Sequence, residues 1–102
     1  SDAERAVEQA TEITPPVITG RIRITGTVLT TKSQDSHFGM TLKMLVRDDR
    51  GFKVWGTVPS SLPNTESGDR VTFIAAVEAS DDDETFGFFK RPTKAQLISE
   101  AN

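Results

Sequence analysis

Apolar and polar residues alternate with a period of two in four separate stretches of this 102-residue chain. In the stretch 21–28, Ile22, Ile24 and Val28 fall on one side, and arginine and threonine side chains fall on the other. Successive side chains of a β-strand point to opposite faces, so this pattern predicts a strand with one buried face. Gly26 occupies a buried position of the same stretch, and a glycine there indicates a bulge or a sharp bend.

The other three alternating stretches are 39–46, 52–58 and 71–77. Aspartate and glycine at 47–51 predict a tight hairpin turn. A shorter apolar run around 95–98 predicts a fifth strand. The polar segments 31–37 and 59–68 are predicted to be loops, and the second is too broken by proline, serine and asparagine for a stable helix. The residues expected to face inward include Ile22, Ile24, Val28, Leu42, Met44, Val46, Val54, Val71, Phe73 and Val77.

The first sixteen residues follow a different pattern. Small and apolar residues recur near helical spacing from Ala3 to Ile13, and Pro15-Pro16 must end any helix. We therefore expect a short helix or linker over 1–16, a barrel over 17–99 and a frayed tail over 100–102. A chain of this length has room for one modest core. The missing initiator methionine favours a part of a longer protein.

Several classes of protein lack support in this sequence. No apolar run is long enough for a transmembrane helix, so we expect no membrane partner, and the first residues lack the apolar centre of a signal peptide. The absence of cysteine favours a reducing, cytoplasmic location. With one histidine, no cysteine, and neither a Gly-x-Ser-x-Gly motif nor a phosphate-binding glycine loop, no nucleophile and base stand at a recognisable spacing. We expect no catalytic residues, no cofactor and no metal.

Charge is distributed unevenly along the chain. The formal net charge of −3 argues at first against a nucleic-acid partner, because phosphate binding usually leaves a basic footprint. Four acidic residues and one arginine lie within 1–12, and four more acidic residues form the block 81–84. Without these two segments 11 basic and 7 acidic residues remain, a balance of +4. The body of the chain is therefore mildly basic.

The stretch 85–95 combines aromatic and basic side chains around Gly87 and Pro92. Its aromatic and basic members are Phe86, Phe88, Phe89, Lys90, Arg91 and Lys94. We expect at least one ring to enter the core, since alternate side chains of a strand point to opposite faces and only one of these faces is outward. The cations cannot be buried unpaired, so they must lie at the surface.

The alternating stretches, the hairpin and the glycine-bent first strand suggest a small barrel, and here the sequence resembles the OB-fold. The resemblance covers about residues 17–99 and rests on 22–28, 54–56 and 68–73. Three blocks, 38–44, 54–59 and 86–95, look like a module of uncharacterised phage and bacterial proteins, which implies no established activity. The resemblance implies an all-β, five-stranded Greek-key barrel, here preceded by the short helix. This chain departs from many OB domains because it has no credible helix between the third and fourth strands. We therefore expect residues 59–68 or the N-terminal helix to close one end of the barrel.

An OB barrel binds nucleic-acid strands across its second and third strands and the loops that flank them. Cations there meet phosphates, and rings stack on unpaired bases. On that basis we expect binding residues on the outward face and on both flanking segments, with His37 and Arg50 nearby. The expected set is Phe38, Lys43, Arg47, Lys53, Trp55, Phe86, Phe88, Lys90, Arg91 and Lys94.

Simpler interpretations stand beside each of these roles. Trp55 can be part of the core, and Lys43 and Lys53 can serve only to keep an edge strand soluble. Arg47 and Arg50 can simply pair with the neighbouring aspartates. The acidic block 81–84 is either a solvated loop tip, a weak collector of divalent cations, or a mimic of phosphate that covers the basic face.

The sequence thus favours a non-catalytic module that binds single-stranded DNA, or RNA, within a larger replication, recombination or repair protein. The alternative is an OB module that binds a protein partner, such as another domain of the parent protein or a replication protein, and no nucleic acid. The sequence leaves open the parent protein, DNA versus RNA, strand polarity, oligomeric state, packing of 1–16 and the role of 81–84.

Overall fold

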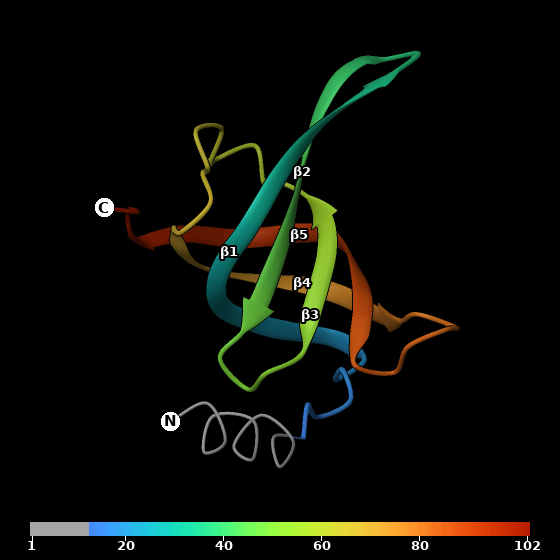
Figure 1. Cartoon of the computed structure of the whole chain (residues 1–102). Coiled ribbons are helices and arrows are strands. Elements are labelled where there is room, and N and C mark those ends of the chain that lie inside the picture. Colours follow the sequence, from blue (N-terminus) through green and yellow to red (C-terminus); the bar gives the residue numbers. More distant parts are fainter. Residues whose placement is uncertain (1–12) are drawn as a thin grey trace, which may run out of the picture.

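Five strands make up the regular structure of residues 13–102, the part of the chain that the computed structural model describes. They are β1 (Gly20–Ser36), β2 (Gly39–Asp48), β3 (Lys53–Thr57), β4 (Arg70–Ala79) and β5 (Phe86–Ser99) (Figure 1). The N-terminal helix expected within 1–16 falls largely on residues 1–12, outside the described range. Within 13–102, no helix is long and apolar enough to cross a membrane.

The strands close into one barrel in the order β1-β2-β3-β5-β4, with β4 pairing back onto β1. All neighbouring pairs are antiparallel except β3 and β5, which run parallel. The expected all-β class and five-stranded barrel are therefore confirmed, and the arrangement is compatible with an OB-like fold. Closure pairs each strand on both sides along part of its length, which removes most exposed sheet edges.

β1 bends sharply (Figure 1) and takes part in both halves of the barrel, with its two pairings overlapping at Gly26 and Thr27. Residues 20–27 pair with β4, whereas residues from 26 onward pair with β2. Gly26 has partners on both sides, Asp48 and Val71. A Cβ atom at Gly26 would lie 2.0 Å from the carbonyl oxygen of Arg47, so only glycine allows β2 to approach this closely. The expected bend at Gly26 is confirmed.

The core consists of inward side chains from all five strands, together with Val17, Phe52 and Val58 from the adjoining segments. Phe73 and Phe89 form its aromatic centre, with ring centroids 4.8 Å apart. Of the residues expected to face inward, Ile22 and Leu42 are partly buried at the rim, and the others are buried. Phe89 is the ring of the stretch 85–95 that enters the core, as one of the three was expected to do.

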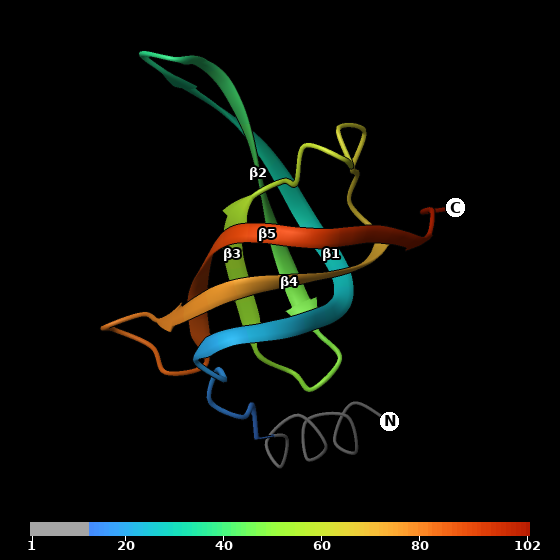
Figure 2. The same ribbon diagram turned by 180° about the vertical axis from the view of Figure 1, so that it is seen from behind.

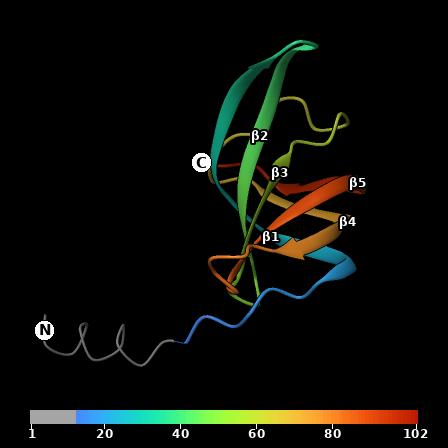
Figure 3. The same ribbon diagram turned by 90° about the vertical axis from the view of Figure 1, so that its right-hand side faces the viewer.

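The segment 31–37 was predicted to be a loop, and that prediction is wrong. β1 and β2 continue past the barrel as a two-stranded arm in which Lys32 pairs with Lys43 and Ser36 with Gly39. The arm projects well beyond the rest of the molecule (Figure 1, Figure 3). Both faces of its outer part are exposed, so its sequence carries no alternation of apolar and polar residues.

The last strand is longer than the short one predicted around 95–98. β5 begins at Phe86, so most of the aromatic and basic stretch lies within a strand. Its pairing with β4 shifts register three times, and these irregularities interrupt the alternation that marks a strand in a sequence. Two of them contain the left-handed residues Arg91, with φ of 53°, and Lys94, with φ of 51°.

The connection from β3 to β4 contains no helix, as predicted. Leu62 from this connection packs against the core. Asp69 is buried, and its carboxylate accepts hydrogen bonds from the backbone N–H groups of Glu66 (2.9 Å) and Ala101 (2.8 Å). The carboxylate thus fastens both the β3–β4 connection and the C-terminal residues to this end of the barrel.

Candidate nucleic-acid interface

Strand pairing places the outward side chains of β2, β3 and β5 in rows across one face of the barrel. Trp55 of β3 lies between Leu45 of β2 and Phe88 of β5. The adjacent row contains Arg47, Lys53 and Phe86, and the row on the other side contains Lys43 and Thr57. We call these residues the Trp55 face: Lys43, Leu45, Arg47, Lys53, Trp55, Thr57, Phe86 and Phe88.

The aromatic side chains of the Trp55 face are only partly covered. Phe88 is 42% exposed, while Trp55 and Phe86 are half-buried. The rings of Phe86 and Phe88 meet edge to face, with centroids 5.2 Å apart. Trp55 is outside the buried core cluster, unlike Val54 of the same strand and Val58, the residue that follows the strand. The rings therefore offer surface on which a planar ligand can stack.

Three cations surround these rings. The Lys43 ammonium donates a hydrogen bond to Thr57 Oγ1 at 2.7 Å, which holds the lysine across β3. Lys53 and Arg47 are exposed, and neither makes an ion pair with any carboxylate of residues 13–102. A cluster of cations beside exposed rings suits an anionic ligand with planar groups.

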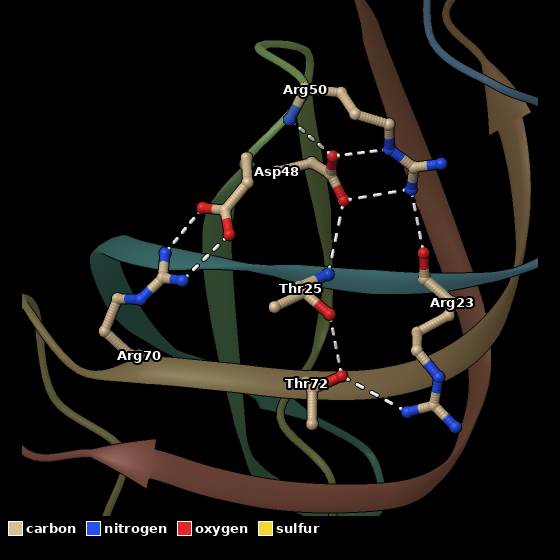
Figure 4. Close-up of polar contacts among 7 residues, drawn as sticks. Arg23, Thr25, Asp48, Arg50, Arg70 and Thr72 are labelled. Carbon is tan, nitrogen blue, oxygen red and sulfur yellow. Dashed lines mark hydrogen bonds and ion pairs between the residues drawn. The ribbon is translucent and has the colours of Figure 1, made fainter.

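Arg50 has a different role, in the anchor of the β2–β3 hairpin (Figure 4). The buried carboxylate of Asp48 accepts hydrogen bonds from Arg50 Nε at 2.7 Å, from the Arg50 backbone N–H at 2.8 Å and from the Thr25 backbone N–H at 3.2 Å. Arg50 Nη2 donates to the carbonyl oxygen of Arg23 at 2.8 Å. The bond with Asp48 raises the pKa of Arg50 above its usual value. The simpler interpretation of Arg50, that it pairs with a neighbouring aspartate, is therefore confirmed.

A second pair fastens the same hairpin to β4. Arg70 Nη2 donates to Asp49 Oδ2 at 2.8 Å, while Nη1 donates to the other carboxylate oxygen (Figure 4). These hydrogen bonds hold the pKa of Asp49 below its usual value. The acidic residues of the hairpin are therefore engaged with Arg50 and Arg70, which leaves Arg47 available on the Trp55 face.

Phe38 and His37 lie at the tip of the arm. Phe38 is fully exposed, and Met40 beside it is 69% exposed. Phe38 is seven residues from Leu45 along the chain, which in an extended strand corresponds to about 23 Å. The structure therefore places Phe38 at the tip of the arm, away from Trp55 of β3, rather than beside it.

The cations of β5 divide between two sides of the barrel. Lys90 is the next outward residue after Phe88 and borders the Trp55 face. Arg91 and Lys94 lie further along, where β5 pairs with β4 alone. There they adjoin Arg21 and Arg23 of β1, which the sequence reasoning did not include in a site. Alternation had placed both arginines outward, but the strand order that brings them near β5 is not visible in the sequence.

The acidic block lies in the β4–β5 turn, at the Lys53 end of the Trp55 face. Asp83 Oδ1 accepts hydrogen bonds from the Thr85 backbone N–H (2.9 Å) and hydroxyl (2.6 Å), so this carboxylate shapes its own turn. These bonds, with a smaller contribution from Lys53, lower the pKa of Asp83. Among residues 13–102, no three metal-ligating side chains converge on one point.

Comparisons of the chain with protein-family models, with curated protein sequences and with solved structures gave no match. The chemistry of the Trp55 face therefore carries the functional interpretation, together with the barrel that presents it.

Proposed function

We propose that the chain is a non-catalytic OB-fold module that binds single-stranded nucleic acid, with DNA favoured over RNA, within a larger replication, recombination or repair protein. The observation that carries this proposal is the row of Leu45, Trp55 and Phe88, flanked by the cations Lys43, Arg47 and Lys53. In this proposal bases stack on the rings of Trp55 and Phe88, and phosphates contact the cations.

The chemistry of a single strand matches this face in two respects. Unpaired bases offer π-faces, and stacking one base on an aromatic side chain is worth roughly 1–3 kcal/mol. The phosphates carry negative charge, and each phosphate contact releases a condensed counterion, so binding weakens as salt rises. A double helix hides its base faces, so the rings favour the single-stranded form.

The surrounding segments extend the proposed interface. Lys90 borders the face beyond Phe88, and Phe38 offers a fully exposed ring at the tip of the arm, just before β2 begins. A strand that crosses the face toward the arm would meet Lys43 and then Phe38. Because nothing covers Phe38 among residues 13–102, this ring can stack on a base without displacing a neighbour.

A second candidate function is binding of a protein partner, and the arm tip is the observation that favours it. Phe38 and Met40 are exposed apolar side chains on a projecting hairpin, and the net charge of the chain is −3. Exposed apolar groups of this kind occur at sites of protein interaction.

A salt titration separates the two functions. Fluorescence anisotropy of a labelled oligo-dT should report binding at low salt, with a slope of log affinity against log salt near −0.7 for each phosphate contacted. The matched duplex should bind more weakly. Absence of oligo-dT binding at the lowest salt used would refute the nucleic-acid proposal and leave the protein-partner function.

A further inference from the structure

We infer that the opposite side of the barrel carries a second phosphate-binding surface, along which a bound single strand continues after it leaves the Trp55 face. This inference rests on the proposed function. The surface is formed by the first half of β1, by β4 and by β5, which lie together in the view from behind (Figure 2). We call it the back face: Arg21, Arg23, Lys90, Arg91 and Lys94.

Strand pairing brings these cations together from distant parts of the chain. Ala76 of β4 is paired with Arg21 on one side and with Lys90 on the other. Ile74 is paired in the same way with Arg23 and with Thr93. The outward positions between the two basic strands therefore hold no charge.

Hydrogen bonds hold Arg21 across β4 to β5, and Arg23 against β4. Arg21 Nη2 donates to Thr93 Oγ1 at 2.7 Å, and its Nη1 donates to the carbonyl oxygen of Arg91 at 3.5 Å. Arg23 Nη1 donates to Thr72 Oγ1 at 3.2 Å (Figure 4). A guanidinium has five N–H donors, so both groups keep donors for phosphate oxygens after making these bonds.

The backbone of β5 is irregular where its cations lie. Arg91 and Lys94 adopt positive φ values, which side chains other than glycine rarely adopt, and each lies within a shift of the pairing between β4 and β5. Bulges of this kind turn side chains away from the regular alternation. Both residues are exposed, as are Lys90, Arg21 and Arg23.

Carboxylates do not neutralise this surface within residues 13–102. The nearby acids Asp48 and Asp49 bond to Arg50 and Arg70 instead. Glu78 pairs with Phe88 in the strand register and so lies at the border with the Trp55 face. The outward residues of β4 between the two basic strands are aliphatic or hydroxylic, without a ring on which a base can stack. The back face is therefore suited to phosphates and not to bases.

Lys90 connects the two faces. It follows Phe88 as the next outward residue of β5, and through Ala76 it is the cross-strand neighbour of Arg21. A strand long enough to pass Phe88 meets Lys90 and then the back face, and on the way it passes the exposed Glu78, the cross-strand neighbour of Phe88. Short oligonucleotides should occupy the Trp55 face alone, and longer ones should reach both.

The test compares oligo-dT of about 6 nucleotides, near the lower end of the usual site size of one such barrel, with oligo-dT of about 20 nucleotides, beyond its upper end. In Arg21→Gln/Arg23→Gln, affinity for the long oligomer should fall about tenfold at low salt. The salt slope should shrink by about 1.4, which corresponds to two phosphate contacts. Affinity for the short oligomer should stay within about twofold of wild type. A twofold change is smaller than the loss expected at low salt from removing one phosphate contact.

Two further variants separate charge from structure. Arg21→Lys/Arg23→Lys retains both charges and should keep the affinity for the long oligomer. If this variant lost that affinity, the arginines would act structurally and the inference would be overturned. Arg91→Gln/Lys94→Gln should reproduce the loss if Arg21→Gln/Arg23→Gln does not fold. The inference would also be overturned if the neutral variants weakened binding of both oligomers equally, or if neither neutral variant had an effect. An effect on duplex DNA alone would overturn it as well. The proposed function fails separately, if the short oligomer does not quench Trp55 fluorescence in the wild type.

Discussion

Trp55 and Phe88 are register partners in the parallel pairing of β3 with β5, the contact that closes the barrel between these strands. The inward neighbours of the same pairing, Val54 and Gly87, are buried, so both rings emerge on the outer surface. Closure of the barrel and assembly of the ring pair therefore depend on one short stretch of pairing. Rings that are 33 residues apart in sequence become adjacent because of it.

Replacing Trp55 should weaken binding of a single strand more than it weakens the fold. Trp55→Leu keeps an apolar side chain over the sheet but removes the aromatic face, so affinity for oligo-dT should fall by roughly 1–3 kcal/mol. Trp55→Phe should retain most of the affinity. Anisotropy titrations measure both, and thermal unfolding shows whether each variant is folded. Equal affinities of the leucine and phenylalanine variants would argue against stacking at this position.

Gly26→Ala should destabilise the barrel strongly. The new Cβ would overlap the carbonyl oxygen of Arg47, so β1 and β2 would have to separate where the strand bends. We expect a loss of about 3 kcal/mol, at the upper end for an overpacked site, measured by urea unfolding. Thr30→Ala on the exposed part of the same strand is the control and should change stability by no more than about 0.5 kcal/mol. A Gly26→Ala protein as stable as wild type would contradict the close approach of the two strands.

The two aspartates of the β2–β3 hairpin should differ in importance. Asp48→Ala removes a buried acceptor from the half-exposed Arg50 and from the Thr25 backbone N–H, and it should cost about 1–3 kcal/mol, the usual penalty for a part-buried donor left without a partner. Asp49→Ala breaks an exposed pair with Arg70 and should cost far less. Chemical denaturation of both variants checks the order, and a larger loss for Asp49→Ala would contradict the anchor assigned to Asp48.

The inward residues of the strands were predictable because burial alone selects them, as in Val71 to Val77 of β4. The bend at Gly26 was predictable for a related reason, since a glycine among buried strand positions needs an explanation. The arm was not predictable, because residues 32–36 bury neither face and so show no period of two. The continuous strand from Phe86 to Ser99 was missed because register shifts near Arg91 and Lys94 interrupt the alternation midway.

The candidate site was predictable only in part. The alternation of side chains along each strand placed Trp55, Lys53 and Lys43 on one face, and the structure brings them together with Phe88. Alternation within a strand does not reveal which strands become neighbours, however. The association of Arg21 with the basic end of β5 depends on the order β1–β4–β5, and that order is a property of the whole barrel.

The charge of Asp83 should oppose binding at the Lys53 end of the Trp55 face. Asp83→Asn keeps a side-chain oxygen for the Thr85 hydrogen bonds but removes the charge, so affinity for oligo-dT should rise about twofold at low salt and not at high salt, where the charge is screened. Deleting the charges of 81–84 together should tighten binding further. Unchanged affinity at every salt concentration would show that the acidic turn does not influence the face.

The same residue should contribute to the acid sensitivity of the fold. Because hydrogen bonds from Thr85 lower the pKa of Asp83, its ionised form is favoured in the folded state. This stabilisation is fully present above the unfolded value of about 3.9 and is lost as pH falls through the lower folded pKa. Wild type should therefore exceed Asp83→Asn in unfolding free energy at pH 7, and the two should converge in strong acid. A difference that persists there would contradict the ionised hydrogen-bonded carboxylate.

Fluorescence of Trp55 tests the central claim most directly, because this is the single tryptophan of the chain and it lies within the proposed interface. Titration with poly-dT at low salt should quench or shift the emission, and added salt should reverse the change as phosphate contacts are lost. No quenching and no spectral shift at low salt would contradict nucleic-acid binding at the Trp55 face.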